Sequence, residues 1–316
     1  MSMFACVLLA NLAGSGGPNL ASLRGFKQGL YLEYVDRDSV RVLPGELFVQ
    51  GGAGGRSLLQ LPVEIELDLP LLGTAADAGF WYVYMRKRAP GMVVVGRAAL
   101  ELVHEAQDLA GDIGAGSRPV RDSLRRGWYH PGPSAGNQSL RCIGAVRCVH
   151  DATLGSILVP FSSDGRTYYY QGYGDEVFDE NGDGTSFFGI APWREVQFPV
   201  PTFASTAVVS VSAEHGGPSV SPTLQVLYRQ SSDSPGFIKL VAIESEGTDG
   251  NVTDRDTAHL HLAIGSALTG EFSVRSLGGG GGALDLGVTV YGWAMGYWMG
   301  DTPAGSLSSP VEALER

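Results

Sequence analysis

The sequence predicts an all-β protein made of two β-sandwich or jelly-roll-like domains flanked by ordered terminal arms. Short runs of alternating apolar and polar residues recur along the chain, separated by Gly, Pro, Ser and Asn, which is typical of half-buried strands and turns. Capping residues followed by long helical periods are scarce. The chain has 45 glycines and only 17% charged residues, against about 25% in an average soluble protein. This balance favours a turn-rich β-protein over a disordered chain.

The first half of the chain holds several strand patterns. Residues 30–34 alternate between apolar and polar side chains, and residues 40–42 are the predicted hairpin partner. Apolar and acidic residues alternate over 63–69 and predict an amphipathic strand. Aromatic and β-branched residues dominate 79–85, and similar runs lie between 140 and 161. Such side chains pack well on a pleated surface, so these runs are predicted strands.

Two other segments of the first half have a different character. The only helix candidate is residues 98–109, where the apolar positions fit either a helical or a strand period. Residues 118–136 contain many turn formers and no periodicity, which predicts a long surface loop. Loops of this length are often functional or contact a partner.

A domain boundary is predicted at Phe198-Pro199-Val200-Pro201, because proline cannot donate to a central sheet ladder. The five glycines 278–282 read as a hairpin loop, since no Lys-Ser/Thr follows them as in a phosphate-binding loop. Strand-like runs recur beyond the boundary at the spacing of a sandwich or barrel, over 206–213, 223–230, 237–244, 258–264, 271–275 and 284–291. The predicted parts are an N-terminal arm and linker (1–25), a β-rich anchoring domain (26–198), a C-terminal β-sandwich (202–300) and a C-terminal tail (301–316).

Charge and hydropathy exclude some classes of partner. The formal net charge of −11 argues against nucleic acid or an anionic membrane as the main partner. No apolar run approaches the ~20 residues that a membrane-spanning helix needs. The first residues lack the basic region of a signal peptide.

The N-terminal segment, residues 1–13, is apolar, and nothing nearby in the sequence would cover it. Burying each of its large side chains would contribute roughly 1.5–3 kcal/mol, enough in sum to dock the chain onto a larger particle or another subunit. The closing run 291–299 is also strongly apolar, so it is a second candidate interface. The predicted particle-docking residues are Phe4, Val7, Leu8, Leu9 and Leu12.

Cys6, Cys142 and Cys148 are an odd set and not a disulfide framework. On one strand, Cys142 and Cys148 would lie on the same face with their sulfurs roughly 20 Å apart, too far for a bridge. A hairpin turning at Gly144 is the alternative that would bring them together. Free buried thiols fit assembly in a reducing cytoplasm.

An acidic segment, Phe178 to Gly184, contains the front half of a calcium loop. Asp179, Asn181 and Asp183 supply oxygen ligands at alternate positions, but the twelfth position is Ile190 where an EF-hand needs a bidentate glutamate. We favour an Asx-rich turn whose side chains bond the local backbone. A calcium site of another type, with Asp175 as a further ligand, stays open. No other cofactor is predicted.

Aromatic residues flank this acidic segment. Such side chains could stack on sugar rings while carboxylates accept hydroxyl hydrogen bonds, which makes them candidate glycan contacts. We favour strand packing and an inter-subunit contact, because interfaces are also rich in Tyr and Trp. The glycan-contact candidates are Tyr168, Tyr169, Tyr170, Tyr173 and Trp193.

No paired acid and base points to an enzyme. Glu64, Glu66 and Asp68 alternate along one exposed strand face, as on a solvated edge. Ser-x-x-Lys and His-Glu-x-x-His are absent from the sequence. The sequence therefore favours a non-enzymatic protein, although a β-rich depolymerase could place its carboxylates by fold alone.

Residues 79–161 carry short motifs in a fixed order: Trp81-Tyr82-Val83-Tyr84, then His130-Pro131, then Arg141-Cys142-Ile143-Gly144-Ala145-Val146-Arg147, then Pro160-Phe161. A predicted hairpin over 39–49 precedes them. This order resembles that of bacteriophage virion proteins over about residues 29–165. It departs from them at Cys148-Val149-His150, where the family often has Thr-Asp. The resemblance implies a tail-fibre, baseplate-peripheral or head-decoration protein.

One further motif is similar to a feature of phage fibres. His259-Leu260-His261 places two imidazoles on one face of a predicted strand, and three copies around a threefold axis would present six nitrogens to a metal ion. The simpler interpretation, which we favour, is a solvated strand face.

These observations lead to one functional expectation. The chain is expected to be a non-enzymatic virion structural protein, a fibre or capsid decoration, that stabilises the particle or presents a host-contact surface. It is expected to assemble in the host cytoplasm as a homo-oligomer, most simply a trimer, and to contact other virion proteins and a host surface glycan. A carbohydrate-binding module and a polysaccharide depolymerase are the alternatives.

Overall fold

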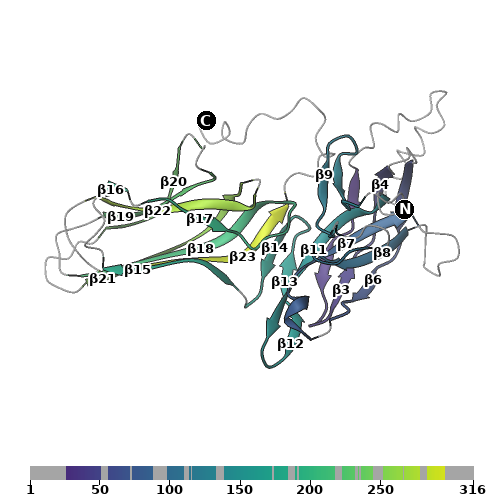
Figure 1. Ribbon diagram of the computed structural model, residues 1–316, viewed down its shortest axis with the longest axis horizontal. Coiled ribbons are helices and arrows are strands. Elements are labelled where there is room, and N and C mark those ends of the chain that lie inside the picture. The colour runs from purple at the N-terminus through teal and green to yellow at the C-terminus, as the bar shows by residue number, and fades with distance from the viewer. Residues whose placement is uncertain are drawn as a thin grey trace.

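The computed structural model confirms the all-β prediction (Figure 1). It describes residues 26–50, 56–71, 73–87, 98–109, 114, 116–132, 139–172, 174–183, 189–190, 192–217, 223–231, 234, 236–244, 252–265, 267–277 and 283–295. The predicted arms, residues 1–25 and 301–316, lie outside this part of the chain. Within the described part, helical structure is limited to a short 3-10 turn, η2, at Ala75–Asp77 and to the 3-10 residue Ser139. No helix there has the length and apolarity that a membrane crossing requires.

We call the strands up to Leu158 the first unit. Three antiparallel sheets form it: β1-β4-β5, β2-β3-β6, and a larger sheet in the order β8-β7-β11-β10-β9 with β12 also on β11. The predicted hairpin and amphipathic strand are confirmed as β2, β3 and β6. Its strands are β1 Lys27–Gly29, β2 Leu32–Tyr34, β3 Ser39–Val42, β4 Gly45–Gln50, β5 Arg56–Leu61, β6 Ile65–Asp68, β7 Gly79–Lys87, β8 Ala98–His104, β9 Val120–Asp122, β10 Gly127–Tyr129, β11 Arg141–Asp151 and β12 Gly155–Leu158.

The second unit is a sandwich of two sheets. The β18 sheet has the order β13-β14-β23-β18-β21, with β15 also on β23. The β22 sheet has the order β16-β22-β19-β20, with β17 also on β22. All six runs predicted beyond residue 202 are strands here. The strands are β13 Phe161–Ser163, β14 Thr167–Tyr170, β15 Asp175–Asp183, β16 Gly189–Ile190, β17 Arg194–Gln197, β18 Ala204–Gly217, β19 Thr223–Arg229, β20 Ile238–Glu244, β21 Val252–Ala263, β22 Thr269–Leu277 and β23 Ala283–Met295.

The strand pairing does not follow the boundary predicted at Phe198–Pro201. β14 and β15 pair with β23, and β17 pairs with β22, although these three strands precede that boundary. The prolines end a strand, as proline chemistry requires, but the sandwich has already begun at Phe161. The division of the chain into two domains stays a prediction.

Two expectations for the first unit are wrong. Residues 98–104 form β8, paired to β7 from Trp81↔His104 to Lys87↔Ala98, and are not helical. Since the apolar pattern fits both a helical and a strand period, pairing with the neighbouring strand β7 determines that this segment is a strand. The predicted loop over 118–136 contains the short strands β9 and β10, which pair with each other. Strands of three residues are too short to show alternation.

The central pair of the first unit, β7 and β11, contains a β-bulge at Ile143. Cys142 pairs with Tyr84 and Gly144 with Val83, so Ile143 has no partner of its own. A bulge inserts one residue and inverts the alternation beyond it. Cys142 therefore shares a face with Tyr84, while Cys148, opposite Gly79, lies on the other face. Both thiols are free and buried, as predicted, but the expectation that they share a face is wrong.

Polar side chains in the interior connect two of the three sheets of the first unit, the β1-β4-β5 sheet and the sheet that contains β11. The fully buried Arg141 donates through Nη1 to the carbonyl oxygens of Phe26 at 2.7 Å and Phe48 at 2.6 Å. Lys27 Nζ donates to the carbonyl of Ile143 at 2.8 Å, inside the bulge. These contacts connect residues about a hundred positions apart in sequence and hold β1 and β4 against β11.

A second buried chain of hydrogen bonds includes Tyr84 and His130 of the motif residues. Tyr84 Oη donates to the Ser117 carbonyl at 2.6 Å, and Ser117 Oγ donates to the Gln107 carbonyl at 2.6 Å. His130 Nδ1 accepts the Gly132 amide at 3.0 Å, and its Nε2 lies 3.2 Å from Ser117 Oγ. A neutral imidazole that accepts at Nδ1 carries its proton on Nε2, so His130 donates to Ser117. The loop before β9 is fixed in this way.

The second unit depends on long strand ladders and an aromatic core. β18 pairs with β21 from Thr206↔Ala263 to Gly217↔Val252, and with β23 along its other edge. Trp293 is 1% exposed and stacks on Tyr168, with ring centroids 4.2 Å apart. Gly292 lies beside it, where a Cβ would come within 2.0 Å of the Tyr168 carbonyl oxygen. Only glycine permits this close approach of β14 and β23.

Candidate functional site

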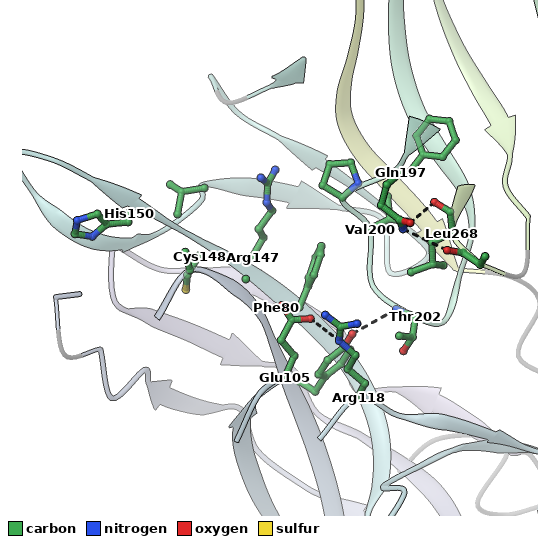
Figure 2. A pocket seen from close by; sticks show the side chains of 17 residues that line it. Phe80, Glu105, Arg118, Arg147, Cys148, His150, Gln197, Val200, Thr202 and Leu268 are labelled. Atoms are coloured by element: carbon green, nitrogen blue, oxygen red, sulfur yellow. Dashed lines mark hydrogen bonds and ion pairs between the residues drawn. The ribbon is translucent and has the colours of Figure 1, made fainter. Parts of the chain in front are cut away.

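A cleft of about 720 Å³ lies where the two units meet (Figure 2). The first unit contributes the start of β7, residues 105 and 118, and the later part of β11. The second unit contributes the segment after β17 and the turn between β21 and β22. The side chains used below are Phe80, Tyr82, Glu105, Arg118, Arg147, Cys148, His150, Gln197, Thr202 and Leu268.

The first wall depends on a glycine. Gly79 opens β7 at φ +130°, a conformation that other residues rarely adopt, and a Cβ there would lie 2.4 Å from Glu105 Oε1. Glu105 can therefore lie against the strand and reach the cleft. Phe80 follows on β7 and is directly opposite Arg147 of β11, so the aromatic ring and the guanidinium share the face that lines the cleft.

The second wall is held by backbone contacts. The Phe198 amide donates to the Leu268 carbonyl at 2.9 Å. Gln197 Nε2 donates to the carbonyls of Ala267 at 3.3 Å and Leu268 at 3.1 Å. Leu268 has φ +62°, a left-handed conformation that is uncommon outside glycine. These bonds fix the turn between β21 and β22 against the end of β17.

The charged side chains that line the cleft are paired. Arg118 Nε donates to Glu105 Oε2 at 3.0 Å, a pair visible in Figure 2. Arg147 forms an ion pair with Asp175 of β15 and lies over the ring of Tyr170, 5.5 Å from its centroid. Burial lowers the pKa of Arg147, yet it stays a cation because arginine normally titrates above about 12. This ion pair joins the two units.

Further contacts cross the junction beside the cleft. The Thr202 amide donates to Tyr82 Oη at 3.3 Å, and Thr202 Oγ1 donates to the Pro119 carbonyl at 3.2 Å. The ring of Phe203 contacts Tyr82 and Trp128 of the first unit and Trp293 of the second, with centroids 5.3–6.2 Å apart. The units are thus joined by a packed interface as well as by the chain between them.

The side chains described in the cleft are suited to non-covalent contacts, between the two units or with a bound group. Burial raises the pKa of the Cys148 thiol, which keeps it protonated and a poor nucleophile. His150 is exposed at one end of the cleft, and its Nδ1 is 3.5 Å from Ser156 Oγ. The walls combine apolar surface from Phe80 and Leu268 with polar groups from Gln197 and the Glu105–Arg118 pair.

The predicted glycan-contact aromatics do not form one surface. Tyr168 and Tyr170 are 2% and 7% exposed, because alternate residues of β14 face the interior, so neither can stack on a sugar. Tyr169, between them, is 41% exposed. Trp193 is half-buried beside the β22 sheet, with Arg229 4.3 Å from its ring centroid. Tyr173 lies outside the described residues.

The acidic segment is a strand and not a turn. Asp179 pairs with Gly287, Asn181 with Asp285 and Asp183 with Ala283, all within the β15–β23 ladder. The long partner strand overrides the local turn preference of these residues. Their side chains lie outside the described part of the structure, so calcium binding by them stays a prediction. Asp175, the optional ligand, is committed to Arg147.

The two histidines lie where the strand pattern places them. His259 and His261 are both exposed on β21, opposite Ser210 and Val208 of β18. Among the described residues, no three His, Cys, Asp or Glu side chains gather closely enough to hold a metal ion. The docking residues Phe4, Val7, Leu8, Leu9 and Leu12 belong to the undescribed N-terminal arm, and their role stays a prediction.

Sequence reasoning missed the cleft because its parts come from distant segments. Phe80, Glu105, Arg147, Gln197 and Leu268 share no motif or spacing. The one available signal was Gly79 immediately before an aromatic strand, which marks a close approach of another group. The prolines at the predicted boundary lie in the segment that lines the cleft, but they were interpreted as a domain boundary and not as part of a site.

No known protein family matches this sequence, and no curated protein does. Among solved structures, Eiger TNF from S. frugiperda has a TM-score of 0.23 at 13% identity, covering 39% of this chain and 94% of that one. The VP2 subviral particle of infectious bursal disease virus has a TM-score of 0.23 at 10% identity, covering 87% of this chain and 72% of that one. A family 43 arabinoxylan arabinofuranohydrolase from Bacillus subtilis gives 0.22 at 13%, covering 81% and 64%. Likenesses this weak, although they include a viral capsid protein, carry no argument about function.

Proposed function

We propose that the chain is a structural protein of a bacteriophage particle, a fibre or capsid decoration, which stabilises the particle or presents a surface to the host. The observation that carries this proposal is the junction between the units. An ion pair between Arg147 and Asp175, the Thr202 hydrogen bonds and the Phe203 cluster hold the sandwich in one orientation on the first unit. A rigid connection of this kind suits a protein that displays one domain from another.

The positions of the motif residues support the same proposal. Arg141 and His130 are buried and hold segments together, and Tyr84 belongs to the same interior. These are the residues on which the resemblance to virion proteins rests. They contribute to packing and not to the chemistry of the cleft, as expected for a protein that assembles and presents.

The proposal includes a homo-oligomer, most simply a trimer, formed in the host cytoplasm and joined to other virion proteins. The apolar arm, residues 1–13, is assigned to docking. A carbohydrate-binding module and a depolymerase are the competing functions, and each has its own readout: glycan binding without the particle, or release of reducing ends from a polysaccharide.

The primary test is mass spectrometry of purified particles, in which the chain should be present at a stoichiometric ratio to the major capsid protein. A chain without residues 1–13 should remain folded and soluble but should no longer join the particle. Native mass measurement of the full chain should give three copies. Absence from purified particles would overturn the proposal, and a truncated chain that assembles at normal occupancy would overturn the role of the arm.

A further inference from the structure

The outer face of the β18 sheet presents a set of side chains that the cleft does not use. Along β18 and β23 the residues alternate: Val209 and Val288 are buried at 1% and 0% exposure, whereas Ser210 and Thr289 are partly exposed. The alternation assigns one face to the core of the sandwich. The opposite face is directed away from the β22 sheet (Figure 1).

Strand register places the outer residues in two rows that cross four strands each. In antiparallel pairs, residues directly opposite each other share a face. The first row runs Tyr169 on β14, Gly292 on β23, Val208 on β18 and His261 on β21. The second row runs Glu176 on β15, Thr289 on β23, Ser210 on β18 and His259 on β21.

The ring of Tyr169 lies along this face. Three strand intervals of about 4.8 Å separate β14 from β21, yet the ring centroids of Tyr169 and His261 are only 6.3 Å apart. The two side chains must therefore extend toward each other over Gly292 and Val208. A tyrosine that pointed straight out from the sheet would not reach. The phenol ring and the imidazole meet edge to face, at an interplanar angle of 72°, and Tyr169 is 41% exposed. We call this pair of rings the platform.

The carboxylate of Glu176 also lies over the sheet. A Cβ built on Gly287 would be 3.5 Å from Glu176 Oε1 and 3.0 Å from Ser212 Oγ, so glycine at this position leaves room for both groups. Beside them, the hydroxyl of Ser210 and the imidazole of His259 belong to the same face. Hydrogen-bonding groups of several kinds thus lie along the sheet beside the aromatic platform, from Ser210 and His259 to the Glu176 carboxylate near Ser212.

The charge of the face selects among ligands. The charged side chain in the two rows is the acid Glu176, and neither row contains a lysine or an arginine. On the same face, Glu214 and Arg255 are strand partners four residues further along β18 and β21. An anionic ligand would meet repulsion and find no cation in either row to pair with. A ring to stack on, together with a carboxylate, hydroxyls and imidazoles on one sheet face, matches an uncharged saccharide with its apolar ring face and its many hydroxyl groups.

We propose that this face binds a neutral saccharide, with Tyr169 stacking on a sugar ring and Glu176 and His261 bonding its hydroxyls. The site deepens the host-contact part of the proposed function and rests on it only for its biological role. Binding is a property of the isolated chain, whereas the proposed function is tested in particles. A chain found in particles that binds no saccharide would therefore remove this inference and leave the structural function standing.

The experiment is a titration of the full chain with maltotriose, lactose, chitotriose and sialyllactose, preceded by a broad glycan array. At least one neutral saccharide should bind, and sialyllactose should bind less tightly than lactose. Tyr169→Ala should weaken binding about tenfold or more, equivalent to about 1.4 kcal/mol, while Tyr169→Phe keeps the ring and retains most affinity. Glu176→Gln should weaken it less than Tyr169→Ala does.

The matched control is Phe237→Ala, which removes an aromatic side chain that is 45% exposed and precedes β20 of the opposite sheet. It should leave affinity unchanged. Circular dichroism and thermal unfolding establish that each variant is folded. The inference is overturned if the array shows no neutral glycan, if sialylated glycans bind best, or if the folded Tyr169→Ala chain binds as tightly as the unaltered one.

Discussion

The two units solve the same problem, the stability of a β-structure, in different ways. In the first unit several strands have only three or four residues, and polar side chains in its interior connect two of its sheets and hold the loop before β9. In the second unit β18, β21 and β23 run for twelve to fourteen residues and satisfy one another through backbone ladders. Its core is aromatic, centred on Trp293 and Tyr168.

The difference indicates how strand length governs the need for polar contacts in the interior. A short strand leaves carbonyl groups at its ends without a ladder partner, and burying them unpaired is costly. Arg141 satisfies the Phe48 carbonyl, which lies just past the part of β4 that β1 covers, and adds a second donor to the Phe26 carbonyl, which also accepts the Phe48 amide. A long ladder satisfies them along its length, so apolar packing can fill the remaining interior. We therefore expect the first unit to be sensitive to loss of hydrogen bonds and the second to loss of volume.

The largest effect is expected for Trp293→Ala in the second unit. Removing a fully buried indole that stacks on Tyr168 leaves a cavity and should cost about 3–5 kcal/mol of the free energy of unfolding. Urea unfolding measures the cost, and hydrogen exchange should show lost protection in β14, β18 and β23. Phe237→Ala, at an exposed aromatic, is the control, expected within about 0.5 kcal/mol. Loss of protection confined to the first unit would contradict the comparison.

Next is Arg141→Met in the first unit. Methionine fills much of the volume but donates no hydrogen bond, and hydrogen bonds to a charged group contribute about 1.5–3 kcal/mol each. With two such bonds lost, we expect a cost of about 3 kcal/mol and faster hydrogen exchange in β1 and β4. Arg41→Met is the control, because Arg41 is near the surface and its ion-pair distances to Glu64 and Glu66 are 3.9 and 3.8 Å; its cost should stay under about 1 kcal/mol. Equal costs for the two arginines would refute the argument.

A smaller effect is expected for Tyr84→Phe, which removes one hydroxyl and keeps the ring. The Ser117 carbonyl loses its donor in a buried site, so the cost should be about 1–2 kcal/mol. The exposed Tyr31, at 42%, gives the matched control Tyr31→Phe, with no measurable change. Differential scanning calorimetry would resolve the two variants. A neutral Tyr84→Phe would show that the loop before β9 is held by packing alone.

The smallest effect concerns Asp164, in the turn between β13 and β14. The backbone amide of Thr167, bonded to Oδ1 at 2.7 Å, and that of Arg166 lower the pKa of Asp164 below its ordinary 3.8. Because the carboxyl group is a stronger acid in the folded protein, its ionised form stabilises the fold at pH values above the ordinary pKa. This contribution to the free energy of unfolding is lost as pH falls through the lowered pKa. Asp164→Asn should therefore be slightly less stable at neutral pH, with the difference vanishing in acid. A difference that grows in acid would contradict the sign.

Much of the second unit could be predicted because its long strands are covered on one face only. Residues 206–213 and 284–291 alternate between apolar and polar, which fixes both strand and face. In β11, by contrast, residues 141–146 are all buried, so no alternation remains and the bulge at Ile143 leaves no trace in the sequence. Residues 168–170 are three consecutive tyrosines, so the sequence shows no alternation of polar and apolar side chains that would tell which of them is exposed.

The site was less predictable than the strands. The cleft joins Phe80, Arg147, Gln197 and Leu268, whose proximity depends on how two units pack and not on any local pattern. The saccharide platform depends on register, since Tyr169 and His261 meet only because four strands are aligned in one row. The sequence indicated Tyr169 as a glycan contact and His261 as a metal ligand, but it could not show that the two side chains lie together.

The long ladders of the second unit also have a mechanical consequence. β23 is hydrogen-bonded to β14 and β15 on one edge and to β18 on the other, and these strands run roughly along the longest axis of the molecule (Figure 1). A force along that axis loads the ladder bonds together in shear, whereas a force across it opens them one at a time. Since forced unfolding is governed by the height of the barrier, the sandwich should withstand tension best in the direction in which its own strands point.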